Sequence, residues 1–412
     1  MTDPLDLDGG LPFAFRARPE DFIVEELASD VEAPDPSGTH VWFTVEKRDV
    51  STPEAARRIA RALGRAPAEV HFAGRKDAVA VTRQRMSIEH VDPDALLALD
   101  LAGIRIRDPL RCRKRIRLGQ TGGNRFHLRL TELAEADHAR LGSRLAELAE
   151  VGLPNAYGEQ RFGADGAGIE LARRLVGGDA IGYLAGMAER VRRNRRAAAH
   201  ELVRRIRDGS SSERRRAREL VPDLDEDLRA VAKELARRRS EDPASLVRAV
   251  PKRTRAFHLS ILQASVYNRV LAERERQGTL RSVLLGDVVA REDGRHSVVT
   301  EERPAPAGAV PTGPICGGKA PLAEGEPGRI ERAALVAEGL SIEDLVAPAG
   351  LTPRGARRPL VAPVTNARLD PWSEGTAWIV FDLPVGAYAT VVLDLLGAAR
   401  PDPGTVSEDV AG

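Results

Sequence analysis

The spacing of apolar and polar residues divides the first 150 positions into alternating strands and helices. His40–Val45 is rich in β-branched and aromatic residues, which is typical of a strand, and Val70–Ala73 predicts a shorter one. Between them, Thr52 followed by a proline predicts a helix that begins with Thr52 as its N-cap and ends near Gly64. Apolar residues recur at helical spacing over Asp137–Glu150, which predicts a second helix.

From about residue 155 to 275 the pattern changes to helical periodicity with many arginines. The predicted helices are Ile169–Val176, Leu184–Arg207, Asp223–Arg239 and Ser260–Glu275. Proline and glycine crowd Glu301–Gly328, which indicates irregular loops. The strand pattern returns at Ala377–Phe381, and Thr390–Leu396 fits either a helix or a strand. A helical stretch between two mixed stretches indicates that one domain interrupts another.

Composition places the chain among ordinary globular proteins. Its 412 residues are 42% hydrophobic and 30% charged, which excludes a wholly disordered chain, a collagen-like chain and a disulfide scaffold. The length suggests two or three domains, or one domain with a large insertion. No apolar run approaches the roughly 20 residues of a membrane span, and no secretory signal is visible. Cys112 and Cys316 lack any paired spacing, so we expect reduced thiols and a cytoplasmic protein.

The charges almost cancel, with 62 Lys and Arg against 61 Asp and Glu, but they are unevenly distributed. The segment from Arg105 to Arg129 holds nine basic residues and one acid, and the segment from Glu189 to Glu219 holds twelve arginines and five acids. Such segments can bind a phosphate backbone. They can equally be solvated faces, and for the second segment the two interpretations have similar weight.

Motifs of cofactor chemistry are absent, and one carboxylate stands out. The sequence has no P-loop, no G-x-G-x-x-G after a strand, no His/Cys cluster and no G-x-S-x-G elbow, so we expect no metal and no cofactor. Asp77 follows a short strand and a glycine and is flanked by bases in Phe72–Gln84. Nearby cations keep a carboxyl ionised, and an ionised carboxylate can act as a nucleophile or base. An aspartate in a turn more often caps the turn, so the motif alone leaves both roles open.

The segment Phe72–Gln84 resembles the F-x-G-x-K-D-x-x-A-x-T-x-Q signature of the TruD family of tRNA pseudouridine synthases. Further blocks similar to this family follow in the expected order over almost the whole chain. They are Pro19–Glu26, Gly122–Phe126, Pro154–Gly163, Ser260–Arg274, Pro311–Pro314, Arg357–Pro359 and Leu383–Thr390. Eight short blocks in order are far more specific than any one of them.

The resemblance implies a cofactor-free isomerase that converts uridine to pseudouridine in tRNA, with D-arm position 13 as the expected target. It assigns the essential carboxylate to Asp77, which either attacks C6 of the base or assists proton removal at C2′. The target base must leave its stack, at a cost of a few kcal/mol. Two alternatives stay open: an RNA-binding protein or chaperone without catalysis, and the same isomerase acting on another RNA site.

The resemblance also implies supporting site residues. Arg16 is expected to clamp Asp77, because arginine binds carboxylates in a bidentate manner. Substrate-binding residues are expected at Phe22, Asn124 and Tyr388, where aromatic rings can stack on a flipped base and the Asn124 amide can offer a uracil edge one donor and one acceptor. RNA contacts are expected at Lys76, Arg113, Lys114 and Arg115.

The fold class implied by the resemblance is α+β. It is a pseudouridine-synthase catalytic domain with a mixed, mostly antiparallel sheet and flanking helices, interrupted by an α/β TRUD insertion domain. We expect the catalytic domain over 1–153 and 351–400, the insertion domain over 154–350 and a disordered tail over 401–412. The expected partner is tRNA, without a membrane or a metal, and a monomer is the default.

Overall fold

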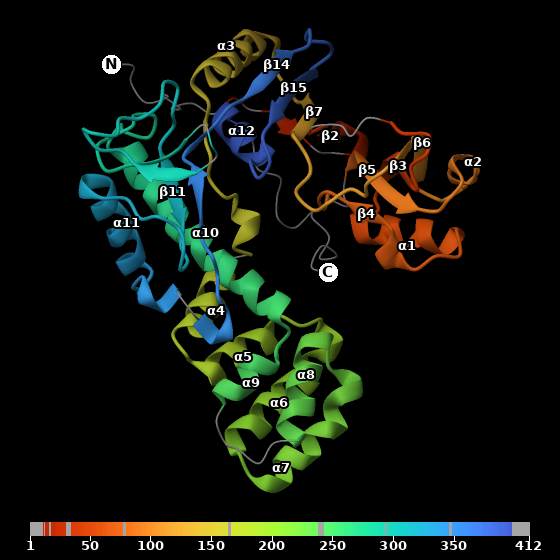
Figure 1. Cartoon of the computed structure of the whole chain (residues 1–412), viewed down its shortest axis with the longest axis vertical. Helices are drawn as coiled ribbons and strands as arrows, with labels where there is room; N and C mark the ends of the chain where they lie inside the picture. Colours follow the sequence, from red (N-terminus) through yellow and green to blue (C-terminus); the bar gives the residue numbers. More distant parts are fainter. Residues whose placement is uncertain are drawn as a thin grey trace. The chain divides into compact units, whose positions relative to one another are not determined.

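The computed structural model describes residues 11, 13–15, 18–29, 34–76, 80–163, 166–237, 243–291, 293, 295–345 and 348–397. Asp77, Arg16 and the predicted tail 401–412 therefore lie outside the described residues. The chain divides into two compact units, the first made of residues 1–153 and 362–412 and the second of residues 154–361 (Figure 1). The sequence pattern placed the return to the first unit near residue 351. The return occurs at Ala362 because residues Ala356–Pro359 form a strand that pairs within the second unit.

The first unit is built on a mixed sheet. Within the described residues the sheet has nine strands, in the order β14-β15-β7-β2-β5-β3-β6, with β1 added to β7 and β4 added to β5. Among these described pairs only β2 and β5 run parallel, which confirms the predicted mixed, mostly antiparallel sheet. The strands are β1 (Ala14–Phe15), β2 (Phe22–Leu27), β3 (His40–Arg48), β4 (His71–Phe72), β5 (Val81–Glu89), β6 (Ile104–Cys112), β7 (Gly123–Thr131), β14 (Thr365–Leu369) and β15 (Ala377–Leu383).

Helices cover one face of this sheet in two separate places. The helices of the unit are α1 (Thr52–Ala62), α2 (Pro93–Leu97), α3 (Glu135–Val151) and α12 (Ala389–Leu396). Beside β2, β7 and β15, helices α3 and α12 bury Leu145 and Val392 in one apolar cluster. Beside β3, β5 and β6, helix α1 buries Ile59 in a second cluster with Phe43. The sheet positions between these clusters, on the same face, belong to neither of them.

The opposite face of the sheet carries a row of alternating charges, which we call the charged row. Register places its members on five adjacent strands: Asp382, Arg125, Glu25, Arg83 and Glu46. Arg125 donates two hydrogen bonds to Asp382, at 2.7 and 2.9 Å, and Arg83 bonds both Glu25 and Glu46. Directly opposed unlike charges on neighbouring strands stabilise their pairing.

The second unit is mainly helical. Its helices are α4 (Ala167–Val176), α5 (Ala180–Glu189), α6 (Arg196–Asp208), α7 (Ser211–Arg216), α8 (Glu226–Arg237), α9 (Ala244–Ala249), α10 (Lys252–Arg276) and α11 (Gly325–Ala337). Short strands form two antiparallel pairs, β9 (Val288–Ala290) with β10 (His296–Val298) and β11 (Thr312–Ile315) with β12 (Ala356–Pro359). The chain passes between the units within β8 (Leu153–Pro154) and β13 (Val361–Ala362).

Three local predictions differ from the structure. The single helix predicted over Leu184–Arg207 is two helices, α5 and α6, because the chain turns between them and both apolar faces enter one cluster. The loops predicted over Glu301–Gly328 contain strand β11 and the first turn of α11, because Arg357 of β12 holds β11 through buried hydrogen bonds to Thr312. The N-cap of α1 is Ser51, not Thr52.

Candidate active site

The loop that carries the Asp77 motif joins β4 to β5. Residues 77–79 of this loop lie outside the described residues, whereas Gly74, Arg75 and Lys76 before them and Ala80 after them are described. Both described ends are fixed by the first unit: β4 pairs with β5 at Phe72, and Val81 opens β5. The described ends of the loop are therefore held by strands of the first unit.

The side chains of Gln84 and Thr52 hold the described part of this loop by hydrogen bonds. The Thr52 hydroxyl donates to Gln84 Oε1 at 2.7 Å and accepts from the backbone N–H of Lys76 at 2.9 Å. The amide nitrogen of Gln84 donates to the carbonyl oxygen of Gly74 at 3.2 Å. Both side chains are buried, so these bonds are shielded from water. Thr52 therefore holds the residue before Asp77, which explains why it does not cap α1.

Three polar side chains, which we call the polar row, cross the sheet between the two apolar clusters: Asn124, Glu26 and Gln84. Asn124 of β7 is directly opposite Glu26 of β2. The parallel register that pairs Glu25 with Arg83 places Glu26 beside Gln84 of β5. Each strand also has an apolar neighbour at an inward position, such as Val24 beside Glu26 and Met86 beside Gln84. A polar row inside an otherwise apolar face requires specific partners.

Lys76 supplies a partner to two members of the polar row. Its ammonium group donates a hydrogen bond to Asn124 Oδ1 and lies 3.6 Å from Glu26 Oε2. The side chains of Lys76 and Glu26 are only 8% and 2% exposed. Burial raises the pKa of Glu26 above its usual value, although the nearby Lys76 charge acts in the opposite direction.

Sequence reasoning missed Glu26 as a site residue, together with two further buried polar groups on the same face. Thr82 of β5 and Lys47 of β3 are paired in register and are 0% and 1% exposed. The Thr82 hydroxyl has no hydrogen-bond partner within the described residues. The available signal was strand alternation: Glu26 follows Phe22 and Val24 at inward positions, so its carboxyl group must also point inward.

Asn124 and Tyr388 belong to the same end of the sheet. Asn124 is opposite Leu383, the last residue of β15, and the turn that leads to Tyr388 follows directly. Gly123 permits this close pairing, since its φ is +135° and an added Cβ would lie 2.3 Å from the Leu383 carbonyl oxygen. Both Asn124 and Tyr388 are half-buried. Their side chains are thus partly accessible.

Phe22 is placed differently from Asn124. It lies four residues before Glu26 on β2, about 13 Å along the strand. The Phe22 ring is buried and meets Phe126 edge to face, with ring centres 6.3 Å apart. The structure therefore brings Lys76 and Asn124 into contact but holds Phe22 in the apolar cluster of α3 and α12.

The predicted RNA contacts Arg113, Lys114 and Arg115 form an exposed turn after β6, which we call the basic turn. Its backbone is held from inside: Trp42 Nε1 donates to the Lys114 carbonyl oxygen at 2.6 Å. The loop that continues from it is tied to the motif loop, because the Gly119 N–H donates to the Ala73 carbonyl oxygen at 2.8 Å. Exposed cations are therefore attached to the segment that precedes Asp77. Lys76, in contrast, is buried.

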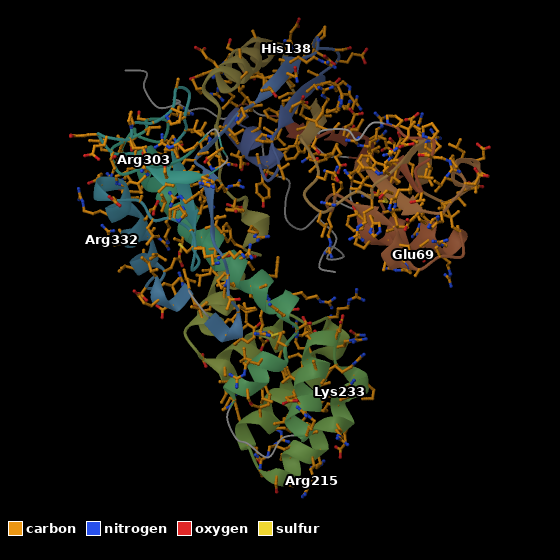
Figure 2. The ribbon with its side chains drawn as sticks, viewed as in Figure 1. Glu69, His138, Arg215, Lys233, Arg303 and Arg332 are labelled. Carbon is orange, nitrogen blue, oxygen red and sulfur yellow. The ribbon has the colours of Figure 1, made fainter. Side chains whose placement is uncertain are left out.

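The second arginine-rich segment, in the second unit, is partly neutralised by its own acids. Arg204 bonds both Glu201 and Glu213, and Arg205 bonds Glu201 at 2.8 Å. Hydrogen bonds from Arg204 and Arg205 lower the pKa of Glu201 to about 2. Other members, such as Arg215 at the end of α7, are exposed (Figure 2). Part of this charge is therefore paired with acids of the same segment.

Several family-like blocks of the second unit meet each other and have a structural role there. Arg358 donates to the Asn155 carbonyl oxygen at 3.0 Å, and its guanidinium lies 4.4 Å from the ring centre of Tyr157. Tyr157 and Asn268 exchange two hydrogen bonds of 2.9 Å. The buried Arg357 bonds Glu331 of α11 at 2.7 Å. These contacts join four separate segments of the second unit.

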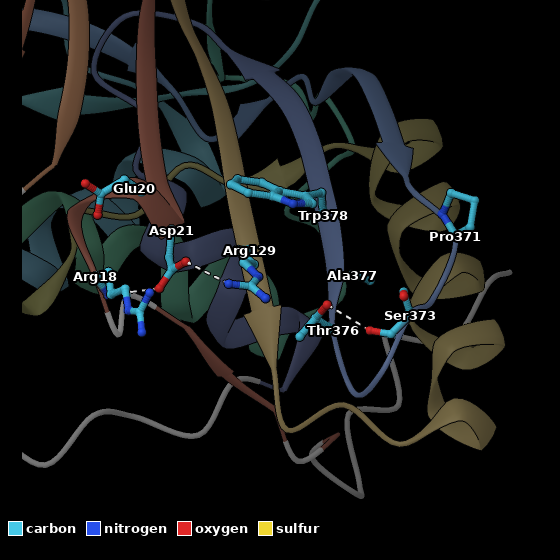
Figure 3. Close-up of a pocket in the computed structure, with 9 residues that line it drawn as sticks. All are labelled: Arg18, Glu20, Asp21, Arg129, Pro371, Ser373, Thr376, Ala377 and Trp378. Carbon is cyan, nitrogen blue, oxygen red and sulfur yellow. Dashed lines mark hydrogen bonds and ion pairs between the residues drawn. The ribbon is translucent and has the colours of Figure 1, made fainter.

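A pocket of about 410 Å³ opens in the first unit near the far end of β7 (Figure 3). Arg129 and Arg18 line it on either side of Asp21, whose carboxylate accepts from the Arg18 N–H at 2.9 Å and lies 3.6 Å from Arg129. Trp378 forms another part of its wall. Arg129 is five residues beyond Asn124 on the opposite face of β7, so this pocket is separate from the polar row.

The described residues contain no group of three or more His, Cys, Asp or Glu side chains placed to hold a metal ion. Cys112 and Cys316 are both buried and are not joined by a disulfide. Within the same residues, every helix is too short or too polar to serve as a membrane span.

Comparison with known proteins identifies the class and then the family. The crystal structure of a TruD protein from Methanosarcina mazei matches with a TM-score of 0.69 and 26% identity, over 94% of each chain. This match defines the fold as that of an α+β pseudouridine synthase. The tRNA pseudouridine synthase D of Geobacter metallireducens is 36% identical over 96% of this chain and 98% of its own, and that of Geobacter sulfurreducens is 36% identical over 95% of both. The family model described as tRNA pseudouridine synthase D (TruD) matches residues 8–394. The chain belongs to the TruD family.

Proposed function

We propose that the chain is a tRNA pseudouridine synthase that isomerises the uridine at position 13 of the D-arm, with Asp77 as its essential carboxylate. The observation that carries the proposal is the buried anchoring of the Asp77 loop beside the polar row, in a member of the TruD family. A protein that only binds RNA has no physical reason to fix this loop with buried hydrogen bonds.

The reaction rearranges one nucleoside without an added reactant. The bond between C1′ and N1 breaks, the uracil ring turns, and a bond between C1′ and C5 forms. The proton on C5 leaves to solvent and N1 gains a proton, so atoms and electrons balance. The carboxylate of Asp77 acts either by adding to C6 of the base or by assisting removal of the proton at C2′.

The remaining site residues serve the carboxylate, the base and the RNA backbone. Arg16 is the proposed cation that orients Asp77. Asn124 and Tyr388, at one end of the sheet, bind the flipped uracil, and Phe22 supports this side of the site from the apolar cluster. The exposed basic turn binds phosphates of the tRNA next to the motif loop. The proposal describes a monomeric cytoplasmic enzyme that acts without a cofactor.

The test is tritium release from an unmodified tRNA transcript labelled at C5 of its uridines. The wild-type protein should release tritium, and the Asp77→Ala variant should release none. Asp100→Ala, at an exposed position, is the matched control and should retain wild-type release. A transcript with cytidine at position 13 should also release none. Binding of tRNA by the wild type without tritium release would overturn the proposal in favour of a non-catalytic RNA-binding protein.

A second measurement separates the two chemical routes. Deuterium at C2′ of the target uridine slows the reaction if the C2′ proton is removed in a rate-limiting step. An unchanged rate in a single-turnover experiment supports attack at C6.

A further inference from the structure

Contact with Lys76 gives the side-chain amide of Asn124 one orientation. An ammonium group has three donors and no acceptor, so the Asn124 atom that faces it must be the oxygen. The nitrogen, Nδ2, therefore points away from Lys76 with both of its N–H groups. It makes no hydrogen bond within the described residues, and Asn124 is only half-buried. Asn124 thus offers a ligand donors only.

Glu26 in turn helps to hold the Lys76 ammonium group. Its Oε2 lies 3.6 Å from Nζ and has no hydrogen-bond partner within the described residues. Its other oxygen, Oε1, accepts from the backbone N–H of Arg85 at 3.3 Å, which attaches the carboxylate to β5. The backbone N–H of Lys76 is bonded to Thr52 as well. The lysine is therefore held at both ends, by its backbone and by its ammonium group.

We propose that Lys76 and Glu26 are positioning residues for the base, because they fix the Asn124 amide so that Nδ2 donates to a carbonyl oxygen of the uracil ring. This inference rests on the proposed function and deepens it. It replaces the expectation that Asn124 pairs with uracil through one donor and one acceptor, since Lys76 already occupies the acceptor. It also gives the buried Lys76 a role other than a phosphate contact.

Without Lys76 the side-chain amide of Asn124 would be free to rotate. A rotation of about 180° exchanges the oxygen and the nitrogen and directs an acceptor at the carbonyl oxygen of the base. Two facing acceptors repel each other, so the base would lose the hydrogen bond from Asn124. The reaction should then be roughly five- to tenfold slower, as expected for the loss of one hydrogen bond of about 1 kcal/mol.

The test combines Lys76 variants with thio-substituted substrates, because sulfur accepts hydrogen bonds more weakly than oxygen. Full-length protein is reacted in single turnovers with tRNA carrying uridine, 4-thiouridine or 2-thiouridine at position 13, each with tritium at C5. The wild type should lose several-fold in rate with one of the two thio substrates. Lys76→Gln should be several-fold slower with uridine but should show little further loss with that thio substrate. Lys76→Arg, which keeps a donor-only group, should retain the wild-type sensitivity.

Controls distinguish positioning from general damage. Lys233→Gln, an exposed lysine of α8 in the second unit, should behave as the wild type with all three substrates. Glu26→Gln tests the same positioning independently, in case Lys76→Gln fails to fold. This variant should show a smaller loss of rate with the thio substrate than the wild type. An equal thio effect in the wild type, Lys76→Gln and Glu26→Gln, or no thio effect in the wild type, would overturn the inference. Failure of the proposed function gives a different result, because the wild type would then release no tritium from the uridine substrate.

Discussion

Single buried polar side chains decide the local geometry of the candidate site. Gln84 uses its amide oxygen toward Thr52 and its nitrogen toward the Gly74 carbonyl oxygen, so one residue connects α1, β5 and the motif loop. No apolar residue of similar shape can make both bonds. Both polar groups of the Gln84 side chain therefore have a defined partner, and these bonds hold the residues before Asp77.

Substitution of Gln84 by leucine tests this anchoring. The variant leaves the Thr52 hydroxyl and the Gly74 carbonyl oxygen without their partner, which should lower the free energy of unfolding by about 1–3 kcal/mol. The rate of tritium release should fall at least tenfold, while affinity for tRNA stays close to that of the wild type. Gln277→Leu, at an exposed position, is the matched control. A Gln84→Leu variant with wild-type kcat would contradict the anchoring role.

The family resemblance named several members of the site but not the contacts between them. Lys76 and Asn124 were both named, yet they are 48 positions apart, and their contact depends on how β2 and β5 align. The position of Glu26 within β2 follows the same register, which no local pattern specifies. Thr52 was mistaken for an N-cap because a threonine before a proline fits that position equally well.

At the scale of strands and helices, the sheet is joined on one face by apolar contacts and on the other by the charged row. The two strands in its centre, β7 and β2, contribute to both faces. In the charged row Asp382 is buried. It accepts two hydrogen bonds from Arg125 and a third, at 2.7 Å, from Asn366. These bonds connect β7, β14 and β15.

The charged row predicts a pH-dependent stability. Hydrogen bonds from Arg125 lower the pKa of Asp382 below its usual value of 3.8, so the native state binds fewer protons there than the unfolded chain. The contribution of Asp382 to the free energy of unfolding is therefore present above about pH 4, and it is lost as the pH falls through the lowered pKa of this group. Asp382→Asn should cost about 1 kcal/mol at pH 7 and should reduce the loss of stability below pH 4, measured by urea unfolding. Asp100→Asn should leave the pH profile unchanged; an identical profile for Asp382→Asn would refute the role of this pair.

The sequence patterns predicted long helices such as α3 and α10, but not where the chain turns between helices or which strands pair. The helical period continues through the turn between α5 and α6, so Leu184–Arg207 was assigned one helix, although the apolar residues on its two halves face one cluster only after the chain turns back. The resemblance gave the class of sheet but not the order of its strands, because pairing partners such as β7 and β15 are remote in the chain.

Over the whole molecule, a net charge of +1 conceals local surfaces of opposite character. In the first unit both arginines of the charged row are bonded to its carboxylates, whereas the basic turn is exposed beside the motif loop. In the second unit arginines such as Arg204 are bonded to glutamates of their own helices. Attraction to RNA should therefore come from a few exposed cations and not from the average charge.

Salt dependence of tRNA binding measures these cations. Binding releases counterions in proportion to the phosphates contacted, so Lys114→Gln should weaken binding and reduce the slope of log affinity against log salt by about one. Lys76→Gln, at a buried lysine, should leave this slope unchanged, as should the control Lys233→Gln. An unaltered slope for Lys114→Gln together with unaltered affinity would show that the basic turn does not contact the tRNA.

Because the first unit is divided between the two ends of the chain, its strands can pair only in a certain order during translation. Strand β7 pairs with β15, and the bonded residues Arg125 and Asp382 are 257 positions apart. While the ribosome is still making residues 154–361, which are contiguous and form their own compact unit, the β15 side of β7 has no partner strand. The nascent chain must keep that edge from pairing wrongly until β15 leaves the exit tunnel, so the catalytic sheet is the last part of the molecule to be completed.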